Sequence, residues 1–154
     1  MNINDFKNRI TNGEFDNEFA TVDGETQKAH ARFCDALDEF KNLYGERDNI
    51  RLFSAPGRTE IGGNHTDHNN GCVLAGSVNL DVIAVVGLND DNTVRVKSRG
   101  YKQDVVELND LEMKPIEDNK AISLIRGTLA KFVQDGYKIG GFDEDFAPGY
   151  YEDD

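Results

Sequence analysis

The hydrophobic and polar residues of this chain follow two different periods, which predict helices and strands in mixed order. Between residues 24 and 45, apolar side chains recur at helical spacing with charges between them, and a glycine follows. The apolar positions are Phe33, Leu37, Phe40 and Tyr44, and the glycine is Gly45. This pattern predicts an amphipathic helix whose aromatic side chains belong to the core.

Further segments read as β-strands because they are short, rich in β-branched residues and bounded by turn residues. They span residues 50–56, 73–88, 93–100 and 104–108. The Pro56-Gly57 dipeptide predicts a turn at the end of the first strand, and the sequence NDDN at 89–92 predicts a hairpin-like turn between the second and the third.

A second long helix is expected after Pro115, which interrupts the strand pattern. Asn119 is the expected N-cap of a helix over residues 121–135, and Gly136 is expected to end it. Its apolar face would carry Ile122, Ile125, Leu129 and Phe132. Two long helices and strands in mixed order argue for an α+β fold with a mixed sheet.

The last part of the chain, residues 142–154, differs from the rest. It carries six acidic residues and one proline, without a periodic apolar pattern. We interpret it as an acidic, weakly ordered tail that follows a domain over residues 1–141.

Composition narrows the class of protein. With 154 residues, 38% hydrophobic and 30% charged, the chain is expected to form one globular domain. Its net charge of -12 disfavours nucleic acid and anionic membranes as partners. The N-terminus lacks the basic start and apolar core of a signal peptide, so a cytoplasmic location is expected. Cys34 and Cys72 lack metal-type spacing and favour buried or idle thiols.

The stretch APGRTEIGGNHTDHNNG, residues 55–71, is unusually rich in glycine and in hydrogen-bonding side chains. Gly62 and Gly63 would allow a backbone to come close to another group. Hydrogen-bonding heads follow directly, at Asn64, His65 and Asp67. Such a segment, expected between two strands, suits a small polar ligand.

This stretch resembles the N-terminal signature of galactokinases, the sugar kinases of the GHMP superfamily, whose common form is APGRxNxIGEHTDYxxG. The resemblance extends over roughly residues 20–143, through RLFSAPG upstream and VLAGSVNLDVIAVV and LIRGTLAKF downstream. Over that length it is far more specific than a glycine pattern alone. It implies the N-terminal domain of a GHMP-type kinase and galactose, or a related small sugar, as ligand.

The resemblance also implies roles for individual residues. Arg58 matches the family's arginine near the reacting phosphate, where a guanidinium offsets charge that develops during phosphoryl transfer. Asn64, His65, Thr66 and Asp67 match the segment that cradles galactose. An ionised Asp67 would accept hydrogen bonds from two neighbouring sugar hydroxyls, while His65 would orient it or contact the sugar.

Three positions depart from the family form. Asn64 stands where glutamate is common, His68 where tyrosine is common, and Glu60 where asparagine is common. Glu60 is expected either to support the loop as a structural acid or to contact the sugar. These differences leave the preference for galactose over a related sugar open.

ATP with Mg is implied by the family, but its phosphate site is not found in this sequence. The family holds phosphates on a Gly/Ser-rich loop of the type GxGLSSSA, soon after the GGFD segment. Here residues 140–143 read GGFD and are followed by EDFAPGYYEDD, and neither that loop nor the later catalytic aspartate is present. We therefore expect an incomplete domain, cut before the phosphate loop, with an exposed apolar edge and self-association through it.

Three functions remain open from the sequence. The first is a galactokinase, which transfers a phosphate from ATP to C1 of galactose. The second is a non-catalytic galactose-binding or regulatory relative. The third is a metal-dependent enzyme using His65, Asp67 and His68, which is disfavoured because neighbouring side chains on an extended loop diverge and His30 is the only other histidine.

Overall fold

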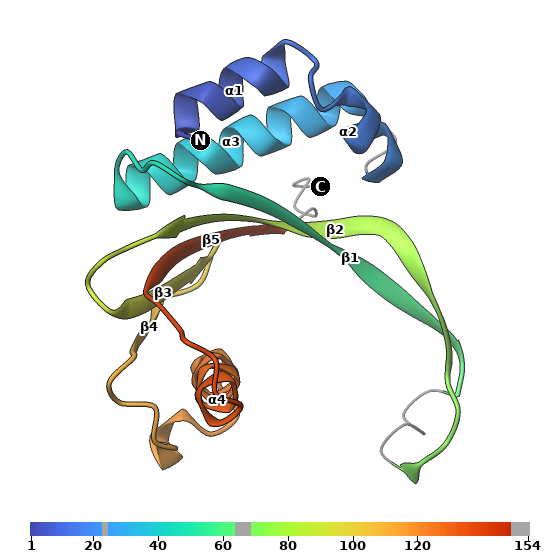
Figure 1. Cartoon of the computed structure of the whole chain (residues 1–154). Coiled ribbons are helices and arrows are strands. Elements are labelled where there is room, and N and C mark those ends of the chain that lie inside the picture. Colours follow the sequence, from blue (N-terminus) through green and yellow to red (C-terminus); the bar gives the residue numbers. More distant parts are fainter. Residues whose placement is uncertain (23–24, 64–68, 149–154) are drawn as a thin grey trace.

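A computed structural model describes residues 1–22, 25–63 and 69–148. It has three layers, with three helices on one face of a five-stranded sheet and one helix on the other (Figure 1). The strand order is β1-β2-β5-β3-β4. The elements are α1 (Ile3–Thr11), α2 (Asp16–Val22), α3 (Thr26–Tyr44), β1 (Arg51–Gly62), β2 (Leu74–Leu88), β3 (Thr93–Ser98), β4 (Asp104–Glu107), the short 3₁₀ helix η2 (Pro115–Glu117), α4 (Ala121–Gln134) and β5 (Phe142–Pro148).

Helix α3 confirms the first helical prediction. It ends at Tyr44, and Gly45 follows with a φ of 77°, a conformation that glycine adopts without strain. Phe33, Leu37 and Phe40 are buried against the sheet and against α1, as their spacing predicts. Helices α1 and α2 were not predicted; α1 begins at the N-cap Asn2, whose side chain accepts a hydrogen bond from the Asp5 amide at 2.8 Å.

Strand β1 does not turn at Pro56-Gly57, so that prediction was wrong. The strand continues to Gly62, with Pro56 paired to Asp81 of β2. Because β1 is at the edge of the sheet, a residue without an amide hydrogen is tolerated there. The strands predicted over 73–88, 93–100 and 104–108 are confirmed as β2, β3 and β4.

The prediction of a weakly ordered tail is corrected for residues 142–148, which form β5 in the interior of the sheet. This strand pairs antiparallel with β2 and parallel with β3. The predicted 89–92 hairpin is therefore also wrong, because β5 lies between β2 and β3. Side chains of β5 alternate between the two faces of the sheet, but two of the inward ones are acidic, so the sequence shows no apolar alternation. Asp143, Asp145 and Ala147 are buried, while Phe142 and Phe146 pack into the hydrophobic cluster between α4 and the sheet. Residues 149–154 lie outside the described residues.

Two buried carboxylates of β5 have opposite environments. Asp143 accepts hydrogen bonds from Asn89 at 3.0 Å, Arg95 at 2.9 Å and Arg47 at 3.2 Å. Asp145 is 0% exposed, and neither of its oxygens has a hydrogen-bond partner among the described residues. Burial raises the pKa of Asp145 to about 6, helped by the negative charge of Glu39.

The second long helix, α4, confirms the predicted segment but not its cap. Lys120 is the N-cap and makes no side-chain capping bond, whereas Asn119 adopts a φ of 60° one residue earlier. Leu129 of α4 is buried in the hydrophobic cluster between α4 and the sheet, and Ile122 and Ile125 pack against this cluster. Phe132 was expected on this face but is 48% exposed, and its ring contacts Tyr137 instead. Within the described ranges, no helix is both long and apolar enough to cross a membrane.

We predict that the stability of the folded chain falls as the pH rises through the pKa of Asp145. The folded state holds the Asp145 proton to about pH 6, whereas the ordinary pKa of an aspartate, 3.8, applies to the unfolded chain. Preferential binding of this proton by the folded state therefore stabilises the fold fully below the ordinary pKa of 3.8, and the stabilisation is lost as the pH rises to about 6. Urea unfolding should show Asp145→Asn to be more stable than the parent by about 1 to 3 kcal/mol at pH 8. The difference should shrink at pH 5.

Asp143→Asn is the matched control, since the Asp143 carboxylate has three hydrogen-bond donors. It should destabilise the chain at pH 8. Equal effects of the two substitutions would contradict the assignment of the pH dependence to Asp145.

Candidate functional site

The candidate site lies on a two-stranded arm, which we define as residues 57–63 and 69–80. The first range is the end of β1 with Gly63, and the second contains the beginning of β2. The arm curves away from the body of the sheet, beyond the reach of β5 (Figure 1). It carries Arg58 and Glu60 and leads into residues 64–68. The motif was expected between two strands, which holds only for its second part. Residues 55–62 of the motif belong to β1 itself, and β2 begins at Leu74.

Two irregularities in strand pairing bend the arm. The register passes from Pro56–Asp81 to Arg58–Ser77, so Gly57 lies opposite residues 78–80. A second shift lies between Glu60 and Gly62. Such bulges increase local twist and turn a ribbon away from its sheet. A Cβ at position 57 would lie 3.1 Å from the Leu80 carbonyl oxygen, a closer contact than side chains usually make. Glycine at this position therefore permits the bulge between Pro56 and Arg58.

Gly63 fixes the two ends of the loop close together. Its φ is 83°, and a Cβ there would lie 2.3 Å from the Cys72 carbonyl oxygen, so only glycine fits. The predicted close approach at Gly63 is therefore confirmed, and the neighbouring group is the chain's own backbone. A Cβ at position 62 would meet no atom within 4 Å, so Gly62 has no such role among the described residues.

Arg58 is the one predicted site residue that the structure describes. Its side chain is 71% exposed, and Nη2 lies 3.4 Å from Oε1 of Glu60, whose side chain is 25% exposed. An exposed pair of this length contributes little stability, which leaves guanidinium donors available to an anion. Asn64, His65, Thr66, Asp67 and His68 lie outside the described residues.

A buried polar cluster at the base of the arm was missed by the sequence analysis. Asp81 of β2 is 3% exposed and accepts hydrogen bonds from Ser54 of β1, at 2.5 Å, and from Arg32 of α3. The cluster ties the α3 layer to both strands where the arm begins. The available signal was that Asp81 is the only charged residue in the apolar run 73–88.

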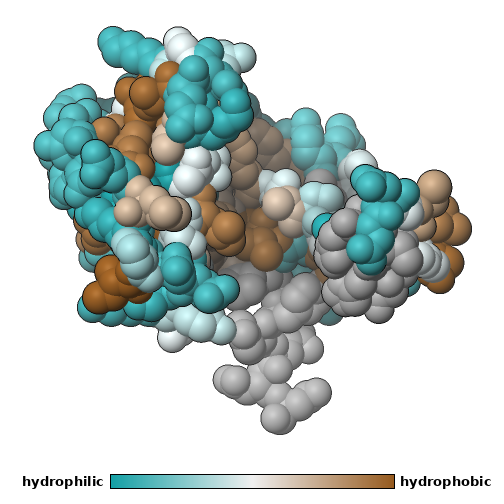
Figure 2. All heavy atoms as spheres, turned by 90° about the horizontal axis from the view of Figure 1, so that it is seen from below, coloured by the Kyte–Doolittle hydropathy of each residue, from teal (hydrophilic) through white to brown (hydrophobic). Residues whose placement is uncertain are grey.

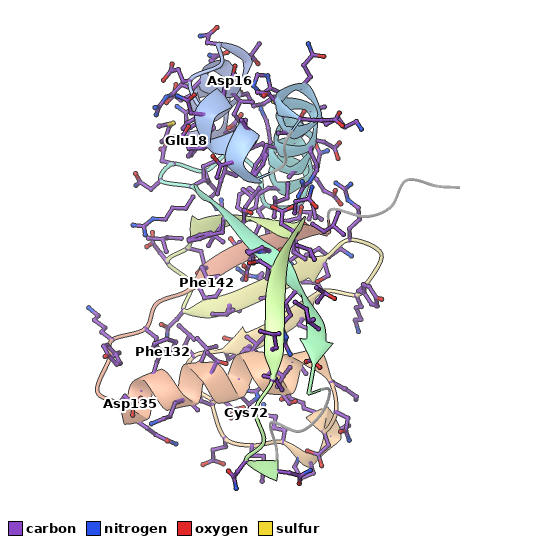
Figure 3. All side chains as sticks on the ribbon, turned by 90° about the vertical axis from the view of Figure 1, so that its right-hand side faces the viewer. Asp16, Glu18, Cys72, Phe132, Asp135 and Phe142 are labelled. Carbon is purple, nitrogen blue, oxygen red and sulfur yellow. The ribbon has the colours of Figure 1, made fainter. Side chains whose placement is uncertain are left out.

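Metal ligands do not gather in the part of the chain that the structure describes. There, no three His, Cys, Asp or Glu side chains are grouped to hold an ion. His30 pairs with Asp16 at 2.6 Å and packs edge-on against Phe19, far from the arm. Figure 3 shows Asp16 in the helical layer and Cys72 on the arm, at opposite ends of the molecule.

The face of the sheet beneath the arm is open and apolar. Figure 2 shows apolar atoms in a hollow between the α4 side and the arm. Phe53 and Val82 are 51% and 39% exposed, and by strand alternation they point away from α3. Glu144 of β5 lies partly buried on this face, and burial raises its pKa to about 7.

Known proteins match this site in sequence. The galactokinase galactose-binding signature matches residues 38–88. The galactokinase of Bacillus subtilis (strain 168) is 32% identical over 108 residues, which are 68% of this chain and 27% of that protein. The galactokinase of Limosilactobacillus fermentum is 36% identical over 90 residues, 57% of this chain and 23% of that protein. The chain thus spans about a quarter of the length of these relatives.

Solved structures confirm the fold class. Lactococcus lactis galactokinase, complexed with galactose, matches with a TM-score of 0.63 and 23% identity, over 75% of this chain and 30% of that chain. Methanococcus jannaschii mevalonate kinase matches with a TM-score of 0.52 and 10% identity, over 69% of this chain and 34% of that one. At these identities the likeness shows a shared fold. The expected fold of mixed α and β elements is confirmed, and this chain shares it with parts of these two proteins.

We predict that Asp81→Asn loosens the base of the arm. Arg32 would lose a charged acceptor, and Ser54 its buried one, so the free energy of unfolding should fall by about 2 kcal/mol. Hydrogen exchange at the amides of Arg51–Ala55 should accelerate. Asp90→Asn, an exposed change of the same kind, should leave both measurements unchanged. Equal exchange rates in the two variants would contradict this role of Asp81.

Proposed function

We propose that this chain, a relative of the galactokinases by its signature and its fold, is the sugar-recognition part of a galactokinase-like protein. The observation that carries the proposal is the extent of the signature. It covers residues 38–88, which contain the end of α3, all of β1 and all of β2. The matched segment is therefore one structural unit, the arm together with its attachment to the body.

In this proposal the tip of the arm binds galactose. Gly63 and the bulges bring the loop ends together, and Asn64, His65, Thr66 and Asp67 supply hydrogen bonds to the sugar. The ionised Asp67 would accept from two adjacent hydroxyls and so distinguish their stereochemistry. The solved Lactococcus lactis galactokinase was crystallised with galactose, which supports this class of ligand.

The proposed reaction is phosphorylation of galactose at C1 by ATP with Mg. Arg58 lies on the same ribbon as the sugar loop, and its exposed guanidinium would offset negative charge on the phosphate being transferred. Within this proposal the cytoplasmic location expected from the sequence stays a prediction, as does self-association through an exposed edge.

The residues of this chain do not fit a nucleotide site. The 154 residues contain no Gly/Ser-rich phosphate loop, and the segment after GG is the acidic strand β5. Asp143 is engaged by arginines of the body, and Glu144 and Asp145 would repel phosphate groups when ionised. Nucleotide binding therefore requires groups that these 154 residues do not supply, and sugar binding does not require them.

Galactose binding by the isolated chain tests the proposal. We expect weak binding, in the millimolar range or about 4 kcal/mol, and clear preference over glucose, because a site that hydrogen-bonds one hydroxyl rejects its epimer. Asp67→Asn should weaken galactose binding by roughly 1 to 3 kcal/mol without unfolding the chain. Ligand-observed NMR measures both effects, with Asp118→Asn as the exposed control. Equal signals for galactose and glucose would refute the sugar site.

Catalysis by the chain alone gives a separate prediction. Because these residues supply neither a phosphate loop nor a catalytic aspartate, turnover of ATP and galactose should stay at or near background. A coupled assay of ADP release measures it. A robust rate that is lost in Arg58→Ala would show that the chain contains a complete site, contrary to this expectation.

A further inference from the structure

Arg58 and Glu60 form an isolated pair of opposite charges on the arm. Among the described residues of the arm, no other residue carries a charge. The two residues are two positions apart on β1, so their side chains turn to the same face of the strand. Their cross-strand partners, Ser77 and Ala75, are small and uncharged. Within the described arm, the charge of Arg58 is therefore compensated by Glu60 alone.

The two side chains differ in how far they are covered. Glu60 is 25% exposed and Arg58 is 71% exposed, and Nη2 of Arg58 lies 3.4 Å from Oε1 of Glu60. This separation is longer than that of a charge-assisted hydrogen bond, so the guanidinium leaves the carboxylate at little cost. The carboxylate, with most of its side chain covered, stays in place. Glu60 is thus a fixed negative charge beside an exposed positive one.

Glu60 also lies between Arg58 and the predicted sugar loop. It is three residues before Gly63, whereas Arg58 is five residues before it. At a rise of about 3.3 Å per residue, Glu60 is roughly 10 Å from the start of the loop. This is about one Debye length at 0.1 M ionic strength, so a ligand held there feels the charge of Glu60. An anion at the loop meets the carboxylate before it meets the guanidinium.

We propose that Glu60 is a specificity-determining residue that makes the arm favour a neutral sugar over the same sugar carrying a phosphate. This inference rests on the proposed function. Galactose is uncharged, whereas a phosphate monoester carries about 1.5 to 2 negative charges at neutral pH. Glu60 repels that charge and also neutralises Arg58, which would otherwise attract it. Galactose 1-phosphate, the product of the proposed reaction, is therefore held more weakly than galactose.

The residue type at position 60 decides this preference. The asparagine that is common at this position in galactokinases has hydrogen-bonding groups but no charge. With such a residue, Arg58 would keep its full attraction for a phosphate held at the loop. The glutamate of this chain is thus a substitution with a defined electrostatic effect on the ligand.

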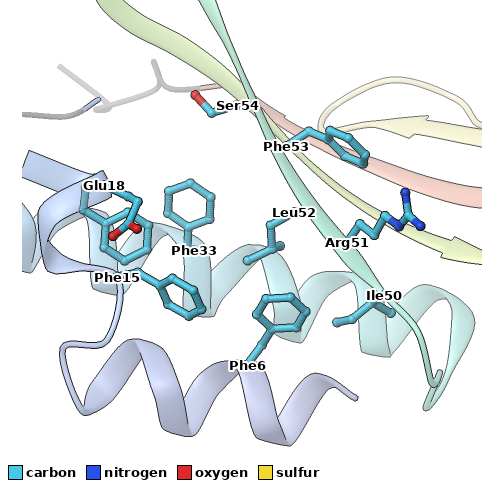
Figure 4. Close-up of a pocket in the computed structure, with 10 residues that line it drawn as sticks. Phe6, Phe15, Glu18, Phe33, Ile50, Arg51, Leu52, Phe53 and Ser54 are labelled. Carbon is cyan, nitrogen blue, oxygen red and sulfur yellow. The ribbon is translucent and has the colours of Figure 1, made fainter. Parts of the chain in front are cut away.

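The aromatic hollow beside β1 offers no alternative site for a phosphorylated sugar. It lies between the N-terminal helices and β1, and Phe6, Phe15 and Phe33 point into it (Figure 4). By strand alternation Arg51 turns to the opposite face of β1, which leaves Glu18 as the charged side chain directed to the hollow. An apolar lining with a carboxylate excludes anions.

Binding of galactose and of galactose 1-phosphate to the full chain tests the proposal. Ligand-observed NMR gives a dissociation constant for each, and the parent should favour galactose. Glu60→Gln should shift the ratio of the two constants about fivefold toward the phosphate. Glu112→Gln removes the same charge from an exposed site between β4 and η2 and should leave the ratio unchanged.

Two outcomes of this measurement would overturn the proposal. A merely structural role of Glu60 would weaken both ligands alike, so that Glu60→Gln would leave the ratio as it is in the parent. A charge effect should also shrink to less than about twofold in about 0.5 M KCl, because salt screens exposed charges. A shift of the same size at high salt would show that Glu60 acts by direct contact.

Titration with inorganic phosphate separates this inference from the sugar site. The probe is the NMR signal of the Arg58 Nε–H group, assigned by its loss in Arg58→Lys. Phosphate should perturb this signal at about fivefold lower concentration in Glu60→Gln than in the parent. Equal responses would overturn the proposal even if galactose binds. The expected response in a chain that fails to bind galactose would refute the sugar site and support the repulsion of phosphate by Glu60.

Discussion

The sheet depends on the hydrogen bonds that the buried carboxylate of Asp143 accepts. Asp143 lies on β5, the only strand that joins the β1–β2 ribbon to the β3–β4 ribbon in the described sheet. Donors reach it from both sides: Arg47 follows α3, while Asn89 and Arg95 come from the segment after β2 and from β3. A buried carboxylate with three donors stabilises β5 in its position between β2 and β3, whereas an unpaired buried carboxylate would destabilise the strand there. Asp145, two residues later, is that unpaired case among the described residues of the same strand.

A second buried carboxylate, that of Asp81, attaches the arm to the body of the sheet. β5 pairs with β2 only as far as Val82, so the described part of the arm beyond it has no third strand. Asp81 lies next to the last residue of β2 that pairs with β5, and its hydrogen bonds to Ser54 and Arg32 hold β1, β2 and α3 together at this point. Asp143 thus stabilises the body of the sheet, which carries the core, and Asp81 attaches the arm, which carries Arg58 and leads into residues 64–68.

The sequence predicts the elements whose burial follows an apolar period. Helix α3 and strand β2 are of this kind, because their inward positions are hydrophobic. Strand β5 could not be recognised, since two of its inward positions are aspartates. The partners of Asp143 lie far away in the sequence, and Asp145 has no hydrogen-bond partner among the described residues. The curved path of the motif was equally hidden, because Pro56-Gly57 is compatible with both a turn and an edge-strand bulge. The candidate site was predictable only through family resemblance, and of its residues Arg58 alone lies in the described structure.

The division between body and arm also bears on how recognition and catalysis can separate. The core clusters consist of residues from the helices and from the body of the sheet, and among the described residues none of their members lies on the arm. Substitutions at described residues of the arm, such as Arg58, therefore leave the packing of the core clusters unchanged. The described parts of the arm are joined to the body by β1, by β2 and by the hydrogen bonds of Asp81 to Ser54 and Arg32. In the proposed function this division places sugar recognition at the end of the arm, apart from the residues whose packing stabilises the fold.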